Sequence, residues 1–249
     1  MLDKTLLAKL NLGQVKWQKE DANIIIHSSD IGYIASNKKE WPANENFQIM
    51  ENKLKLSNFY WLNQPKRFLI DKKSLSILTE PETDLWQRTY YGFSVSNAPA
   101  FLTPIEGDFT FSVKTEFDAS SFLYDQCGML MYIDNENWVK VSVEYENKKF
   151  SRLGSVVTNL GFSDWATTDI PAGVWEMWYR LSRRSHDFYI ENSVDGKIFR
   201  QMRMLHMHKP FDIANVGVYA CSPLHSSFKA FFTKFKMGAC KWPVYETHK

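Results

Sequence analysis

Apolar and polar residues alternate with a period of two along most of the chain. The clearest run is 109–117, where mostly apolar residues at odd positions alternate with polar residues at even positions. Similar runs cover 127–133, 139–145 and 175–181. A period of two places successive side chains on opposite faces of a strand, so each run predicts a half-buried strand with one face on a core.

Polar segments that favour turns separate these runs, at 134–137, 146–149, 182–187 and 195–197. The last contains Asp195-Gly196 between two strand-like runs, which is a strong hairpin signal. Closely spaced short strands with almost no helical pattern predict an all-β protein, an antiparallel β-sandwich or jelly roll.

The chain divides into three parts on this pattern. Residues 1–53 are expected to form an N-terminal extension with strands of its own and a short helix at 2–10. Residues 54–240 are expected to form the β-sandwich, and 241–249 a C-terminal tail. The apolar start MLDKTLLAKLNLG is interrupted by Lys9 and lacks a small-residue cleavage site, so we expect neither a signal peptide nor a membrane span.

Composition narrows the classes of function. The formal net charge of the 249 residues is only +2 and no long basic block occurs, which argues against nucleic-acid binding. Three cysteines without metal-ligand spacing favour a reduced, cytoplasmic protein. Aromatic residues make up 15% of the chain, which suits both a β-rich core and sugar recognition. No pattern indicates a cofactor.

A row of polar side chains, Lys140, Ser142 and Glu144, occupies one face of the predicted strand 139–145. It has three possible roles. The row can be a solvated outer face, the floor of a binding cleft, or the acid/base machinery of a glycosidase.

Catalytic and metal motifs are not found. The E-x-D-x-x-E pattern of jelly-roll glucanases begins three times but each time lacks its third acid, which is replaced by Gln87, Phe111 or Ser121. His206 and His208 share a strand face, but the acid and glycine residues of a cupin metal motif do not accompany them. There is also no nucleophile elbow and no nucleotide-binding motif. We therefore assign no catalytic residue and no metal ligand.

The segment from about 59 to 238 resembles the domain-of-unknown-function 1349 family, which includes regulation-of-enolase and YesU-like proteins. The matching blocks, in chain order, are WLNQP at 61–65, TDLWQRTYYGF at 83–93, GDFTFSV at 107–113, YDQCGMLMYIDNENWVKVSVEY at 124–145, VVTNLGFSDWA at 156–166, WYRLSRRSHDFYIENSVDGK at 178–197, QMRMLHM at 201–207 and VGVYACSP at 216–223. The resemblance implies a concanavalin A-like (lectin/glucanase) β-sandwich, in which a concave sheet often binds sugar. It carries no established active site.

Candidate ligand-binding residues follow from the polar row and the blocks around it. Carboxylates and amides bond sugar hydroxyls, and an indole stacks on a sugar ring. Trp138, Trp178 and Arg180 fall on the polar side of their strands. The full set of candidates is Asp84, Trp86, Tyr124, Gln126, Trp138, Lys140, Glu144, Asp164, Trp165, Trp178 and Arg180. The alternative is that the acids satisfy turn amides and that Lys140 pairs with Glu144 or a cross-strand acid.

Three functions remain open. The first is a non-catalytic, lectin-like module that binds a sugar or sugar derivative on its concave face. The second is a regulatory protein-interaction module of carbon metabolism, for which FKAFFTKF at 228–235 is the segment to inspect, although its alternating set is typical of core. The third is a sugar-active enzyme with Glu144 as general acid or base, which requires a second carboxylate and a raised pKa.

Overall fold

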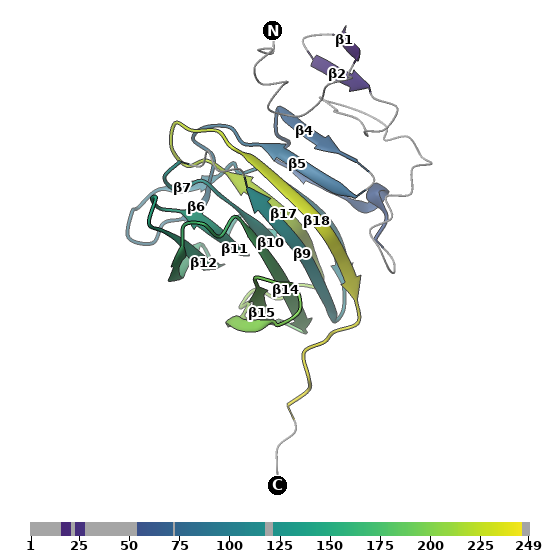
Figure 1. Ribbon diagram of the computed structural model, residues 1–249. Helices are drawn as coiled ribbons and strands as arrows, with labels where there is room; N and C mark the ends of the chain where they lie inside the picture. The colour runs from purple at the N-terminus through teal and green to yellow at the C-terminus, as the bar shows by residue number, and fades with distance from the viewer. Residues whose placement is uncertain (1–15, 21–22, 28–53, 72, 118–121, 246–249) are drawn as a thin grey trace.

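The computed structural model describes residues 54–71, 73–117 and 122–245, together with the backbone of 16–20 and 23–27. Strands dominate these residues, and a single 3-10 turn, η1 (Leu56–Asn58), is their one helical element (Figure 1). The described residues contain no helix with the length and apolarity needed to span a membrane.

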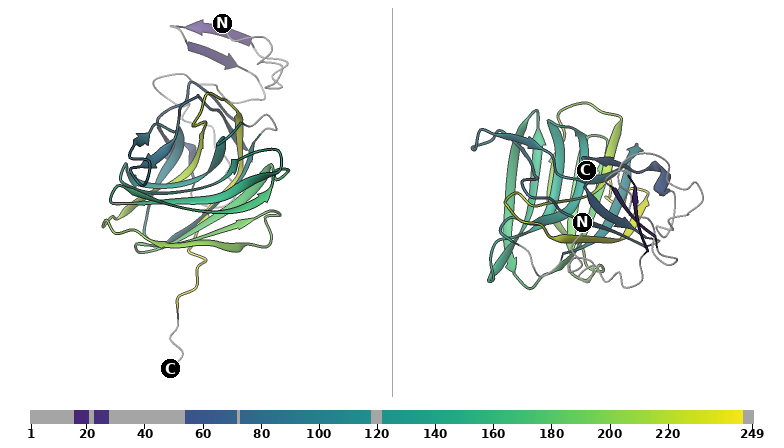
Figure 2. Two further views of the ribbon diagram at one scale, coloured as in Figure 1. Left: turned by 90° about the vertical axis from the view of Figure 1, so that its left-hand side faces the viewer. Right: turned by 90° about the horizontal axis from the view of Figure 1, so that it is seen from above.

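Two seven-stranded antiparallel sheets form the body of the structure. Sheet I has the order β13 (Phe162–Pro171), β12 (Phe150–Asn159), β11 (Asn137–Tyr145), β10 (Gln126–Asp134), β17 (Ile213–Cys221), β8 (Ala100–Glu106) and β3 (Tyr60–Leu62). Sheet II has the order β16 (Arg200–His206), β15 (Asp187–Ser193), β14 (Glu176–Arg184), β9 (Phe109–Phe117), β18 (Lys229–Gly238), β5 (Ser74–Leu78) and β4 (Arg67–Ile70). Curved layers of strands lie over one another in the left view of Figure 2.

Two hairpins accompany the sheets. One pairs β6 (Leu85–Gln87) with β7 (Ser94–Ser96), and the other pairs β1 (Lys16–Glu20) with β2 (Asn23–His27). The second hairpin lies in the segment 1–53, for which strands were expected, while the helix expected at 2–10 lies outside the described residues.

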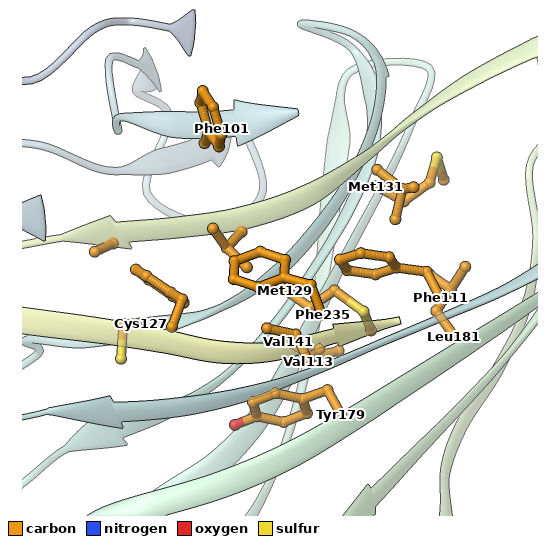
Figure 3. Packing of buried hydrophobic residues seen from close by; sticks show 14 of the residues in the cluster. Phe101, Phe111, Val113, Cys127, Met129, Met131, Val141, Tyr179, Leu181 and Phe235 are labelled. Carbon is orange, nitrogen blue, oxygen red and sulfur yellow. The ribbon is translucent and has the colours of Figure 1, made fainter. Parts of the chain in front are cut away.

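The main core lies between the two sheets. Val141 from sheet I and Phe111, Val113 and Tyr179 from sheet II are buried within it (Figure 3). In β11 every odd position from Val139 to Val143 belongs to this core. The alternation in the sequence therefore marks the faces of these strands correctly, and the prediction of an antiparallel β-sandwich is confirmed.

A second, smaller core covers the outer face of sheet I, the face turned away from sheet II. The hairpin β6–β7 packs there, with Leu85 and Trp86 against Trp138 and Tyr219. Gln87 N donates a hydrogen bond to Ser163 Oγ (2.9 Å), which ties the hairpin to β13. Part of the polar side of sheet I is therefore buried, because a separate hairpin covers it.

The predicted turns hold with two corrections. The segment 134–137 was expected to be a turn, but β10 continues to Asp134 and β11 begins at Asn137, so the turn is only Asn135-Glu136. The segment 182–187 was expected to be a turn, but β14 continues to Arg184 and β15 begins at Asp187, so the turn is only Ser185-His186. The hairpin predicted at Asp195-Gly196 is confirmed as the β15–β16 connection. Gly196 has φ +68°, and a Cβ there would lie 2.6 Å from the Trp178 ring, so both the backbone and the space require glycine.

Candidate functional site

The polar row of β11 lies on the outer face of sheet I, and most of it is shielded from solvent. Lys140 is 3% exposed and Ser142 is also buried, whereas Glu144 is partly exposed as a whole residue. These side chains point away from sheet II because the valines between them fill the main core. The row therefore lies on the outer face of sheet I but is largely buried, unlike an ordinary solvated surface.

An ion pair joins this row to the hairpin β6–β7. Lys140 Nζ lies 2.7 Å from Asp84 Oδ1, which also accepts a 2.7 Å hydrogen bond from Leu85 N at the start of β6. Burial acts to lower the pKa of Lys140, but the negative charge of Asp84 and its other neighbours outweighs burial, so the pKa is raised. Lys140 is therefore a fully charged anchor for the hairpin.

Glu144 has one satisfied carboxylate oxygen and one free one. Oε2 accepts a hydrogen bond from Gln126 Nε2 (2.9 Å). Oε1 is buried and has no hydrogen-bond partner among the residues that the structure describes. Gln126 cannot turn to serve it, because its own Oε1 accepts from Tyr219 OH at 2.8 Å and from Ser142 Oγ at 3.4 Å.

Burial raises the pKa of Glu144 to about 7, against the opposing effect of the Lys140 charge. Near neutral pH the carboxyl group is therefore present in both forms. The ionised form accepts hydrogen bonds only, and the protonated form can also donate one. A buried carboxylate oxygen without a donor is costly, so a hydroxyl or amine that reached it would be stabilised there.

Arg152 and Trp165 lie beside Glu144. Arg152 is the direct cross-strand neighbour of Glu144 on one side and of Asp169 on the other. Its Nε is 3.2 Å from Glu146 Oε2, an ion-pair contact without hydrogen-bond geometry. The guanidinium carbon also lies over the Trp165 ring, 5.4 Å from its centroid, so Arg152 covers part of one face of an aromatic side chain that is 37% exposed.

Small residues lie next to this group in register across four strands. The order across the sheet is Gly128, Ser142, Gly154 and Thr167. A Cβ on Gly154 would lie only 3.3 Å from Trp165 Nε1, so the indole rests against the glycine backbone. This row of small residues is bordered by Glu144 and Arg152 on one side and by Lys140 and Trp165 on the other.

Residues 61–240 match the family described as "Protein of unknown function (DUF1349)". The chain belongs to this family. Its curated relative "Regulation of enolase protein 1" from Saccharomyces cerevisiae (strain ATCC 204508 / S288c) is 30% identical over 187 residues, covering 74% of this chain and 91% of the relative. The resemblance inferred from the sequence blocks is thus confirmed.

Solved structures show the same architecture. A functionally unknown protein from Saccharomyces cerevisiae aligns with a TM-score of 0.69 and 29% identity, covering 76% of this chain and 99% of that one. The GH43 BlXynB protein from Bacillus licheniformis aligns with a TM-score of 0.57 and 14% identity, covering 87% of this chain and 46% of that one. The second similarity shows the fold alone.

Five of the candidate residues predicted for this DUF1349 chain gather their side chains on the outer face of sheet I. They are Asp84, Gln126, Lys140, Glu144 and Trp165. Tyr124 adjoins the group through its carbonyl oxygen, which accepts a 3.3 Å hydrogen bond from Gln126 Nε2. Trp86 and Trp138 belong to the same face but are buried in its small core, so their ring faces are not open to a ligand in this structure.

Three candidates lie elsewhere. Asp164 points to the other side of β13 and pairs with Arg203 of sheet II at 2.8 Å. Trp178 packs on Gly196, and Arg180 forms a two-bond ion pair with Glu191, both in sheet II. The structure does not bring these side chains to Glu144, because Asp164 faces the other side of sheet I and β14 belongs to the opposite sheet.

Arg152, Tyr219 and Asp169 belong to the cluster but were missed. Arg152 follows the turn after Glu144 and could have been found from a hairpin register centred on 146–149. Tyr219 sits in an apolar run and reaches Gln126 only through the pairing of β10 with β17, which no local pattern shows.

Exposed aromatic side chains form a second surface feature at residues 88–93, which join β6 to β7. Tyr90 is 93% exposed, and Tyr91 and Phe93 are also exposed and stack with ring centroids 5.7 Å apart. Arg88 Nη1 donates to the Gly161 carbonyl (2.9 Å) and Arg88 lies over the exposed Phe162 ring. We call Tyr90, Tyr91, Phe93, Leu160 and Phe162 the aromatic patch.

The segment 228–235 does not provide such a surface. Phe228, Ala230 and Phe232 are buried in the main core, as the alternation indicated. Among the described residues, no group of three or more His, Cys, Asp or Glu side chains is arranged to hold a metal ion.

Proposed function

We propose that the outer face of sheet I binds a sugar or sugar derivative at the Glu144 cluster and does not catalyse its conversion. One observation carries the proposal: the Glu144 Oε1 atom is buried beside a row of small residues and lacks a donor among the described residues. A sugar hydroxyl supplies such a donor. Trp165, which Arg152 covers on part of one face, keeps 37% of its surface exposed and offers that part of the ring for stacking.

Binding without turnover is favoured by the state of the neighbouring acids. A glycosidase of the usual kind needs two carboxyl groups on either side of the scissile bond. Asp84 is held by Lys140 and Leu85 N, and Glu146 is paired with Arg152. The raised pKa of Glu144 would suit a general acid, but Asp84 and Glu146 are committed to cations, and Arg152 stands between Glu144 and Asp169 in the strand register.

A thermal-shift screen of neutral sugars and short oligosaccharides tests the proposal. A ligand that binds only the folded protein adds about 2.7 kcal/mol of stability at a hundredfold excess over its Kd. We expect Glu144→Gln to weaken binding by about tenfold or more, since a hydrogen bond to a charged group contributes about 1.5–3 kcal/mol. Trp165→Ala should weaken it similarly through lost stacking.

Two matched variants serve as controls. Glu176→Gln removes an exposed carboxylate of sheet II, and Trp178→Ala removes a half-buried indole from the same sheet. Both should keep the affinity of the parent protein. The proposal fails if no sugar shifts the melting temperature, or if the control variants lose binding as strongly as Glu144→Gln does. Sugar consumption measured in the same samples decides whether turnover occurs.

The aromatic patch favours a second candidate function, a regulatory protein-interaction module. Exposed Tyr and Phe beside an arginine are typical of the residues that dominate protein interfaces. The loop also adopts positive φ at Arg88 (55°) and Tyr90 (62°). The backbone conformation that exposes these rings is therefore strained. Because a relative is named for the regulation of enolase, enolase is the partner to test.

For this candidate we expect purified enolase to bind the protein in biolayer interferometry. The double variant Tyr90→Ser/Phe93→Ser should weaken that binding at least tenfold, because aromatic anchors contribute about 2 kcal/mol or more at interface centres. Tyr245→Ser, which removes another exposed tyrosine, is the control. Absence of binding, or equal loss in both variants, would remove this candidate.

A further inference from the structure

We propose that the Glu144 cluster selects neutral or amine-bearing sugars and rejects phosphorylated or carboxylated ones. This inference rests on the proposed function and adds the chemical class of the ligand. It follows from the signs of the charges around the cluster and from which of them are already paired.

Acids outnumber bases on this part of the face. The strands of sheet I and the start of the hairpin place four carboxylates around the cluster, Asp84, Glu144, Glu146 and Asp169, against two cations, Lys140 and Arg152. The charges of Asp84, Glu146, Lys140 and Arg152 all act on Glu144 itself. A phosphate or carboxylate brought to Glu144 would therefore meet a surface with excess negative charge.

Each cation already has an acid beside it that offsets its charge. Lys140 is buried and bound to Asp84 at 2.7 Å, so its ammonium group cannot reach a ligand without breaking that pair. Arg152 is engaged by Glu146 and by the Trp165 ring. Anion sites in proteins usually use a fork of arginine N–H groups, a lysine or a helix N-terminus. The described part of the chain has no α-helix, so the third device is also missing there.

Other lysines near the Glu144 cluster do not reverse its net negative charge. Lys148 and Lys149 are exposed in the turn between β11 and β12, where water and salt screen their charge. The acceptors that remain for a ligand are the unpaired Glu144 Oε1 and the exposed carboxylate of Asp169. Acceptors bind hydroxyls and ammonium groups, and an amine adds a charge-assisted hydrogen bond.

Isothermal titration calorimetry with matched sugars tests the selection. The probes are glucose, galactose, mannose and xylose, then glucosamine and galactosamine, and finally glucose 6-phosphate and glucuronate. We expect at least one neutral or amino sugar to bind, and the amino form to bind at least as tightly as its neutral parent. The phosphorylated and carboxylated forms should bind at least tenfold more weakly than the neutral parent.

A charge variant makes the argument specific. Glu146→Gln removes the partner of Arg152 and one of the four acids, so the affinity for glucose 6-phosphate should rise at least threefold. Glu176→Gln, in sheet II, should produce no such rise. Tight binding of the phosphate to the parent protein would overturn the selection while leaving sugar binding intact. If no probe of any class bound, both the proposed function and the selection would be overturned.

Discussion

Replacing Phe232 with alanine is expected to lower the free energy of unfolding by about 3–5 kcal/mol, the usual cost of a large cavity at a buried phenylalanine. Phe232 is fully buried in the main core, where β18 pairs with both β5 and β9. The loss should appear as a lower midpoint of urea denaturation with an unchanged m-value.

Its neighbour Phe231 provides the matched control. Phe231 points to the opposite face of β18, is only partly buried and lies under the Lys229 ammonium group at 4.3 Å. Phe231→Ala should cost about 1 kcal/mol, in line with surface or half-buried substitutions. Equal losses for the two variants, or a larger loss for Phe231→Ala, would mean that the register of β18 is not the one described.

Asp84→Asn is expected to destabilise the protein by about 3 kcal/mol, because it leaves the Lys140 ammonium group buried without its counter-charge. The side chains of Lys140 and Asp84 are 4% and 21% exposed, so solvent does little to replace the lost partner. The hairpin β6–β7 starts at the same carboxylate, so its packing should loosen as well. Chemical denaturation measures the loss, and amide hydrogen exchange in β6 and β7 reports on the hairpin.

A double-mutant cycle separates the ion pair from other effects. Asp84→Asn/Lys140→Met replaces the buried pair by uncharged groups and should recover much of the loss, because buried pairs contribute little net stability over apolar residues. The comparison variant Asp164→Asn breaks the exposed pair with Arg203 and should cost less than about 1 kcal/mol. Strictly additive effects of the two substitutions at Asp84 and Lys140 would contradict the coupling described.

Much of the fold is predictable from local patterns. The alternation at 109–117 and 139–145 places each side chain on the correct face of β9 and β11, because a period of two is a property of the strand itself. The hairpin at Asp195-Gly196 is equally local, since the glycine conformation is required within the turn.

The candidate site is less predictable because it depends on which strands become neighbours. Trp138 and Trp178 have the same relation to their own strands, yet one lies in sheet I under a hairpin and the other in sheet II. Asp84 and Lys140 are in contact although 56 positions separate them in the sequence, and Tyr219 and Gln126 although 93 positions separate them. Alternation shows that a side chain points away from the main core, but it does not show which other element of the fold covers that side chain.

The most direct measurement of the central claim is the titration of the Glu144 carboxyl carbon by NMR, with and without the sugar that binds best. The account predicts a pKa of about 7 in the free protein, caused by burial. It also predicts a lower pKa in the complex, because hydroxyl donors stabilise the ionised form, so affinity should rise as pH increases through this range. A pKa that the sugar leaves unchanged would contradict the assignment of Glu144 to a ligand site, and a free-protein pKa near the ordinary value of 4.5 would contradict its burial.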